Sequence, residues 1–454
     1  MEPAKQSLFK KFTQGYTFKI LMLIALVLLL LIPLAMIKGL IYERNRTANE
    51  AEEGVMEAWG SQLAEAGPVI ALPGVKTTEV RTKTEREGET IGITNTPFTL
   101  LIAPRQLNIT AEFKTEVRRR GIFSVPLFSG SLRLSGSFDP APALASLGPD
   151  EHISLNQAEL IIALSSQKGI RRIDRARWNS GELFFQPGNR GLNLSRLYTG
   201  QSSGIFAALP GFENSAGEFD ITIAIQGGQF VRFLPVGQDT RVKIAADWAS
   251  PSFQGSFLPN ESNISDSGFD AVWDVSYLSR DIPLYWKAGD ERDYSASLFG
   301  VNFFRAIDTY SLNTRAVKYA ILFLIVPFLT LFLLEIFAGK RIHPIPYLLS
   351  GIANVVFYLL LLSLSEQMQF YFAYLAAASA VTVMMTLYSR SLLPSWQKSW
   401  YMGLVVLLSY VLLYAVLNAE SYALLIGSVG TFIVVGLVMF LTRKLDWYGQ
   451  DHTG

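Results

Sequence analysis

A few ionisable and polar residues lie inside or beside long apolar segments of this chain, where an uncompensated charge is costly. Glu335 lies near the end of one such segment, shortly before His343. Lys318 and Glu366 lie at segment boundaries, and Asn354 is in the middle of a segment. Groups of this kind could form a proton relay or an intramembrane active site. Pairing at helix ends and snorkelling to the membrane surface would explain them equally well.

A match to the G-x-S-x-G nucleophile pattern occurs at residues 200–204, with Ser202 in the position of the nucleophile. In a hydrolase this pattern forms a sharp turn from a strand into a helix, which exposes the serine. The following residues reach Pro210 too soon for that helix, and His152, the one histidine expected on the same side of the membrane, precedes the serine. We therefore interpret the pattern as a turn between strands and expect no catalytic residue there.

Two arginine-rich segments, residues 118–120 and 171–177, are the densest cationic groups outside the apolar segments. Guanidinium groups suit phosphate and carboxylate, so an anionic lipid head group or glycan is one candidate ligand. The alternative is a solvated strand face whose arginines pair with nearby acids.

Composition excludes several classes of function. The 454 residues are 17% charged and 50% hydrophobic, whereas soluble domains are charged at about a quarter of their residues, so the chain is typical of a membrane protein. Cysteine is absent and only three histidines occur, so we expect neither a metal site nor another cofactor. A net charge of +1 argues against nucleic acid as a partner.

Six apolar runs are long enough to cross a membrane as helices. The first run, residues 20–37, covers about 27 Å at the helical rise of about 1.5 Å per residue. Lys38, Glu43 and Arg44 follow it closely instead of a small-residue cleavage site, so we expect an uncleaved anchor. The other five runs are residues 319–338, 347–364, 370–388, 400–417 and 422–441.

Lysine and arginine in the short connections predict the orientation, because cytoplasmic loops accumulate these residues. They fall on one side of the predicted membrane throughout, and the opposite short loops carry Glu366 and Glu420 instead. The residues on the basic side are Lys5, Lys10, Lys11, Lys19, Lys340, Arg341, Arg390, Lys398, Arg443 and Lys444. We expect both termini in the cytoplasm and a large periplasmic region between the first two spans.

That region changes from helical to strand periodicity along its length. Ala51, Val55, Ala58 and Trp59 recur at helical spacing, which predicts a helical stalk. Later segments alternate apolar and polar residues, as in an antiparallel sheet with one buried face. The predicted fold is six transmembrane helices with a β-rich periplasmic domain between spans one and two. We place the boundaries at 1–19 (cytoplasmic), 20–37 (span), 38–66 (stalk), 67–317 (β-rich domain), 318–441 (five-helix bundle) and 442–454 (cytoplasmic tail).

The stretch from Tyr310 to Glu366 and the ending from Leu441 to Tyr448 resemble the CreD family of bacterial inner-membrane proteins. The resemblance extends over nearly the whole chain and is weakest at residues 76–203. It implies a link to cell envelope integrity and to a two-component regulon. The candidate functional residues, all of which lie in these two stretches, are Arg315, Lys318, Glu335, His343, Glu366 and Asp446.

We expect a non-enzymatic inner-membrane protein whose β domain engages an envelope partner under stress. The candidate partners are membrane lipids, an envelope protein, and an anionic glycan or lipid; the oligomeric state stays open. The alternatives are a transporter or lipid-handling protein that uses the bundle, and a membrane-anchored hydrolase. Broken helices or a lined cavity in the bundle would favour transport, and a Ser, His and acid within hydrogen-bond reach would favour hydrolysis. A sealed bundle with a grooved β domain would favour the anchor.

Overall fold

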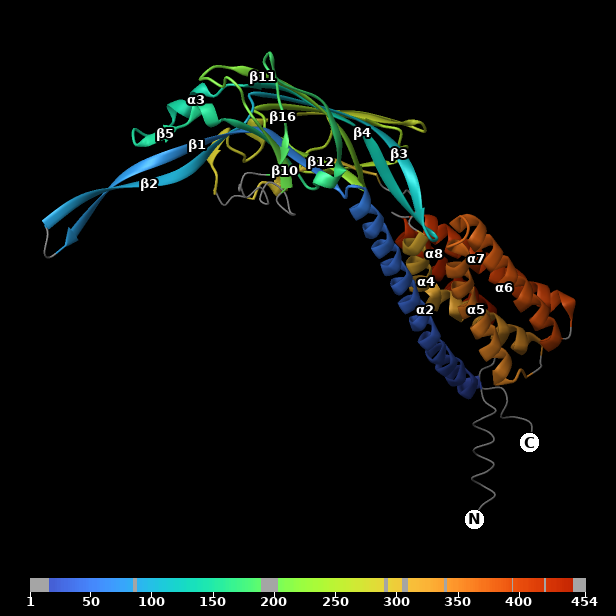
Figure 1. Ribbon diagram of the computed structural model, residues 1–454. Helices are drawn as coiled ribbons and strands as arrows, with labels where there is room; N and C mark the ends of the chain where they lie inside the picture. Colours follow the sequence, from blue (N-terminus) through green and yellow to red (C-terminus); the bar gives the residue numbers. More distant parts are fainter. Residues whose placement is uncertain are drawn as a thin grey trace, which may run out of the picture. The chain divides into compact units, whose positions relative to one another are not determined.

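The computed structural model describes residues 16–84, 88–188, 203–289, 293–303, 309–338, 341–393, 395–419 and 422–443 (Figure 1). The chain divides into two compact units. One unit comprises Met1–Ala48 with Ile307–Gly454, and the other is Asn49–Ala306. We call them the membrane unit and the β unit.

Six helices within the described residues are long and apolar enough to cross a membrane. They are α2 (Tyr16–Trp59), α4 (Thr309–Ala338), α5 (Pro344–Ser365), α6 (Phe370–Leu392), α7 (Trp396–Asn418) and α8 (Ala423–Thr442). The chain between α2 and α4 consists mainly of strands, with one short α-helix, α3 (Ala141–Ala145), among its described residues. The predicted fold class, six membrane helices with a large β-rich insertion after the first, is therefore confirmed.

Close helix packing in the membrane unit depends on small residues, as expected where burial from water contributes little. A Cβ atom at Gly351 of α5 would lie 2.2 Å from the Leu30 side chain of α2 and 2.6 Å from the Phe328 ring of α4. Ala373 and Ala377 of α6 are fully buried. By contrast, a Cβ at Gly427 of α8 would meet open space, and large apolar side chains of α8 are exposed. Three helices thus meet at Gly351, while α8 presents its surface to lipid.

The described residues of the β unit form two sheets. Along its main path the first runs in the order β14-β18-β12-β1-β6-β10-β9, with β2 and β5 paired to β1 and β17 paired to β2. Its strands are β1 (Leu63–Thr84), β2 (Gly88–Ile102), β5 (Glu151–Ile153), β6 (Glu159–Leu164), β9 (Gln186–Pro187), β10 (Ser203–Ala208), β12 (Phe230–Leu234), β14 (Pro251–Gly255), β17 (Tyr285–Lys287) and β18 (Phe299–Phe303). The hairpin of β1 and β2 extends beyond the other strands (Figure 1).

The second sheet runs β15-β16-β13-β3-β4-β11-β7-β8. Its strands are β3 (Gln106–Arg120), β4 (Phe123–Phe138), β7 (Ile170–Trp178), β8 (Gly181–Glu182), β11 (Gly217–Gly228), β13 (Asp239–Ala246), β15 (Glu261–Ser265) and β16 (Gly268–Ser276). Its pairs are antiparallel except for β3 with β13, which is parallel. This sheet carries the candidate binding surface.

Alternating apolar residues of the second sheet face the core, as the strand periodicity predicts. Phe219, Ile221, Ile223 and Ile225 of β11 are all buried, and the residues that alternate with them, Asp220, Thr222 and Ala224, are half-buried. Trp273 of β16 is fully buried, and its indole N–H donates to the Phe257 carbonyl at 3.2 Å. Buried residues of both sheets form one continuous core. The opposite face of the second sheet is left to polar side chains.

Helix α2 ends at Trp59, before the predicted end of the stalk at residue 66, and β1 begins at Leu63. Gly60 has φ +144°, and a Cβ there would lie 2.7 Å from the Gln226 carbonyl oxygen. The helix therefore ends where the chain turns tightly against β11. Gly67 and Pro68, directly after that predicted boundary, lie at a register shift inside β1.

Candidate functional site

Glu335 of α4 is paired with the first helix, α2. Lys19 of α2 donates from Nζ to Glu335 Oε1 and, at 3.0 Å, to the carbonyl oxygen of Ile342. The Tyr347 hydroxyl of α5 donates to Glu335 Oε2 at 2.6 Å. The Lys19 side chain is 17% exposed and that of Glu335 is 9% exposed, so solvent screens this ion pair little.

Glu366, at the end of α5, forms a second group in which a carboxylate accepts from a cation of α2 and from a tyrosine hydroxyl. Arg44 of α2 donates from Nε to Oε1 and from Nη2 to Oε2, both at 2.9 Å. The Tyr310 hydroxyl of α4 donates to Oε1 at 3.1 Å. This forked geometry matches two parallel N–H groups to one carboxylate, which lysine could not do. Both groups join α2, α4 and α5.

A third polar group lies in the middle of α5. Asn354 donates from Nδ2 to the carbonyl oxygen of Phe323 in α4 at 2.7 Å. Its Oδ1 accepts from the Tyr410 hydroxyl of α7 at 3.1 Å, and the Tyr410 carbonyl accepts from Tyr374 of α6 at 2.6 Å. The group links the four helices α4 to α7. Asn354 is 2% exposed, so its polar atoms are satisfied by protein rather than by water.

The other candidate residues of this unit lie outside these groups. His343 is exposed and caps α5, because its Nδ1 accepts from the Ile345 N–H at 3.4 Å. Arg315 donates to the Val416 carbonyl oxygen at 3.4 Å. Lys318 is exposed, and Asp446 lies outside the described residues. The structure thus brings Glu335 and Glu366 into two separate groups at opposite ends of α5, and the five candidates that it describes do not form one site.

Across the described residues, α4 to α8 each run as one continuous helix. The Lys19 and Arg44 positions are about 37 Å apart along α2 at about 1.5 Å per residue. Each carboxylate accepts from one cation and one tyrosine, so both are neutralised where they lie. The two groups therefore fasten the first helix to the bundle at two positions, Lys19 and Arg44.

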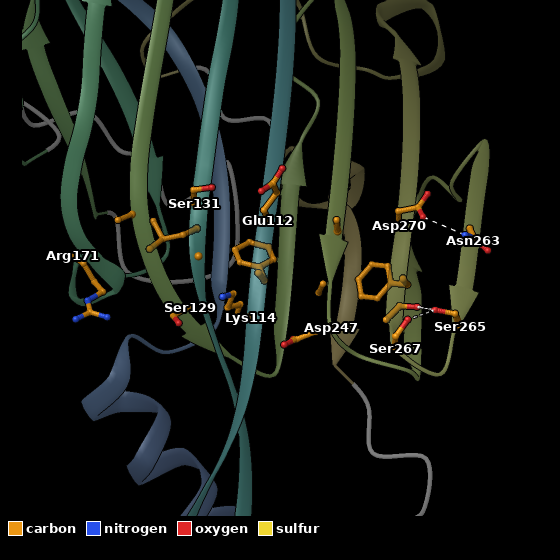
Figure 2. A pocket seen from close by; sticks show the side chains of 18 of the residues that line it. Glu112, Lys114, Ser129, Ser131, Arg171, Asp247, Asn263, Ser265, Ser267 and Asp270 are labelled. Atoms are coloured by element: carbon orange, nitrogen blue, oxygen red, sulfur yellow. Dashed lines mark hydrogen bonds between the residues drawn. The ribbon is translucent and has the colours of Figure 1, made fainter.

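The outer face of the second sheet of the β unit carries a groove of about 850 Å³. Figure 2 shows Arg171 on one side, Glu112 and Lys114 on the middle strand, and Asp270 and Asn263 on the other side. Short side chains form its floor, among them Ser129, Ser131, Ala224 and Ala245. We call this the sheet groove.

Strand register explains how residues distant in sequence meet in the sheet groove. Directly paired positions across seven strands form one row, because paired residues of neighbouring strands share a face. From β7 to β15 the row reads Arg172, Ala224, Ser131, Glu112, Ala245, Asp270 and Asn263. The small residues beside Glu112 leave room above the sheet, and the longer side chains flank that room.

Charges beside the sheet groove are paired, whereas several inside it are not. Asp220 accepts from Arg133 at 2.9 Å and from Arg175 at 2.8 Å, and the hydrogen bond with Asp220 raises the pKa of Arg133 above its ordinary value. Among the described residues, the side chains of Glu112, Lys114 and Arg171 form no hydrogen bond or ion pair. Charged groups without protein partners along a groove are suited to a polar ligand.

A hydrolase site receives no support from the described residues. Ser202 itself lies outside them, but Ser203–Ala208 forms β10, where the nucleophile turn requires a helix. His152 is exposed on β5. No group of three or more His, Asp or Glu side chains among the described residues could hold a metal ion.

Comparison with known proteins agrees with this architecture. The model of the family described as "Inner membrane protein CreD" matches residues 15–448. The chain belongs to the CreD family. CreD of Escherichia coli K12 is 30% identical over 434 residues, which cover 95% of this chain and 93% of that protein. CreD proteins reside in the inner membrane and are not a known enzyme family, and the six candidate spans fit a multi-pass protein.

Two solved structures show a remote likeness. An M1 zinc metallopeptidase from Deinococcus radiodurans, bound to a Tyr-Ser-Ala substrate, has a TM-score of 0.21 and 11% identity, covering 45% of this chain and 42% of that chain. A two-domain M1 zinc metallopeptidase bound to L-arginine has a TM-score of 0.20 and 12% identity, covering 38% and 39%. At such TM-scores the likeness carries no argument about the CreD fold or its activity.

The sequence reasoning missed the sheet groove almost entirely. Arg171 and Arg172 stood out as part of a cationic segment, but Glu112, Asp247 and Asp270 carried no motif. The available signal was the run of small outward-facing residues on neighbouring strands, such as Ser129, Ser131 and Ala224, where longer polar residues are usual. That signal depends on strand register, which no single segment of a CreD sequence reveals.

Proposed function

We propose that this chain is a non-enzymatic inner-membrane protein that supports the cell envelope under stress, and that its β unit binds an envelope partner at the sheet groove. The helices serve as an anchor. The observation that carries the proposal is a contrast between two sets of polar groups. Glu335, Glu366 and Asn354 of the membrane unit are each held by hydrogen bonds from neighbouring helices, whereas the side chains of Glu112, Lys114 and Arg171 in the sheet groove have no partner among the described residues.

An anchor explains the three polar groups better than a transport path does. A carboxylate that carries a proton or a substrate needs a state in which it is free, whereas Glu335 and Glu366 are each held by a cation and a tyrosine. Transporters also place discontinuous helices around a central site. The described helices of this bundle continue through their length.

Both termini are proposed to lie in the cytoplasm and the β unit in the periplasm, where it would meet wall polymers and envelope proteins. Lysine and arginine at alternate loops support this orientation. A reporter active only in the periplasm, fused after Asn260, should therefore be active, and one fused after Arg341 should be silent.

Site-specific photo-crosslinking in living cells tests the binding proposal. A photoreactive residue at Ser131 or Asn263, both in the sheet groove, should yield a crosslinked product. The same residue at Lys243, exposed on the same sheet but outside the groove, serves as the matched control and should not. Products of equal yield from all three positions, or from none, would refute binding at this groove.

A further inference from the structure

The charges of the sheet groove are ordered across the sheet. Arg171 and Arg172 lie on β7, Glu112 and Lys114 on the central β3, and Asp270 on β16. Asp247, which follows β13, lies on the same side as Asp270 (Figure 2). The groove is therefore cationic toward β7 and anionic toward β16. A ligand of a single charge sign would meet like charge over about half of its length.

The spacing of the strands sets the length of a matching ligand. Five inter-strand steps separate β7 from β16 in the order β7-β11-β4-β3-β13-β16. At about 4.8 Å per step this is about 24 Å, the length of about seven residues of extended peptide. Neutral and acidic sugars of similar length lack the ammonium groups that would suit the acidic side.

The floor and walls of the sheet groove also suit a peptide backbone. Ser129 and Ser131 are half-buried on the floor, and Ser265 and Asn263 line the acidic side. Hydroxyl and amide side chains can both donate to carbonyl groups and accept from N–H groups of a bound peptide. The short floor residues permit close approach, and the unpaired Lys114, Arg171 and Glu112 provide the charged contacts.

We propose, resting on the function proposed above, that the sheet groove binds an extended zwitterionic peptide of about seven residues. Its carboxylates lie toward Arg171 and Lys114, and its ammonium groups lie toward Asp247 and Asp270. A segment of an envelope protein and the peptide of a wall polymer share this chemistry. A purely anionic head group or glycan is excluded by the acids on the β16 side.

Fluorescence anisotropy on the full chain in lipid nanodiscs tests this inference. The probe is a labelled, end-blocked peptide, Asp-Asp-Gly-Ser-Gly-Lys-Lys, and the matched control is Asp-Lys-Gly-Ser-Gly-Lys-Asp, with the same composition and net charge. We expect the first to bind at least about tenfold more tightly, equivalent to about 1.4 kcal/mol. Equal affinity of the two peptides would overturn the inference.

Substitutions in the sheet groove then test which side of the groove binds which end of the peptide. Arg171→Gln and Asp270→Asn should each weaken binding of the block-charged peptide several-fold, and Lys243→Gln should leave it unchanged. All three side chains are exposed, so the folded protein should melt at the native temperature. Unchanged affinity in both groove variants would contradict the proposed orientation and the inference with it.

Competitors separate the sources of the ligand. Disaccharide-peptide fragments of the wall polymer that displace the probe would identify the wall peptide, and displacement only by envelope-protein peptides would identify a protein segment. Displacement by glycerol phosphate, the head group of an anionic lipid, would replace the peptide with a lipid and refute the inference. If Ser131 crosslinks in cells while neither peptide binds, this inference fails and the proposed function stands.

Discussion

Asn354 of α5 donates a 2.7 Å hydrogen bond to the carbonyl oxygen of Phe323 in α4, and Pro327 lies four residues after that carbonyl. Proline has no backbone N–H, so the Phe323 carbonyl lacks its normal helical donor. The asparagine replaces that donor from the neighbouring helix. A proline and an asparagine that each look unfavourable in an apolar span are thus explained by one another.

This pairing predicts a non-additive pair of substitutions. Asn354→Leu should destabilise the bundle by about 1 to 3 kcal/mol, because it leaves the Phe323 carbonyl without a donor and Tyr410 without its acceptor. Pro327→Ala restores the N–H of residue 327, so Asn354→Leu should cost less in that background. Thermal melts of the native protein, the two single variants and the double variant in detergent give the coupling energy between the two residues. If the losses of stability of the single variants add up to that of the double variant, this account is contradicted.

The ion pair between Lys19 and Glu335 can be tested with a second double variant. Glu335→Gln leaves Lys19 without its anionic partner, so it should lower the melting temperature in detergent. Replacing both residues, Lys19→Gln with Glu335→Gln, removes the unpaired charge and should recover most of the loss. Envelope function in cells should recover with stability. Normal stability without function in the double variant would instead identify Glu335 as a proton- or substrate-handling residue.

Glu65 of β1 predicts a pH dependence of the β unit. Its side chain is fully buried, paired strand positions place it beside Leu164 and Phe233, and both carboxylate oxygens lack a hydrogen-bond partner among the described residues. Burial raises the pKa of Glu65 well above the ordinary value for glutamate. The folded chain therefore keeps a proton that the unfolded chain has lost.

The free energy of unfolding should consequently fall as the pH rises from the ordinary glutamate pKa toward the raised one. Glu65→Gln has no proton to lose, so it should be more stable than the native chain near pH 8, and its advantage should shrink toward pH 4. Glu112→Gln, at an exposed position, is the control and should show no such trend. Thermal melts of the purified full chain at pH 4 and pH 8 measure this difference in stability. If Glu65→Gln is more stable than the native chain by the same amount at both pH values, the raised pKa of Glu65 does not explain the difference.

Much of the fold could be predicted from sequence because its signals are local. The apolar runs specify the helices, and alternation such as Phe219 to Ile225 specifies strands with one buried face. The partners of Glu335 and Glu366 could not be predicted, since Lys19 and Arg44 lie more than 300 residues away in sequence. The sheet groove was hidden for the same reason: Arg172, Glu112 and Asp270 meet only through the register of seven strands.

The central claim, that the β unit acts through the sheet groove while the helices anchor it, is tested most directly by rescue of an envelope-stress defect in a deletion strain. Two variants are compared at equal membrane abundance. One carries Glu112→Gln, Lys114→Gln and Arg171→Gln in the groove, and the other carries Lys19→Gln and Glu335→Gln in the membrane unit. The account predicts that the groove variant loses rescue and the membrane variant keeps it; full rescue by the groove variant, with loss in the membrane variant, would contradict it.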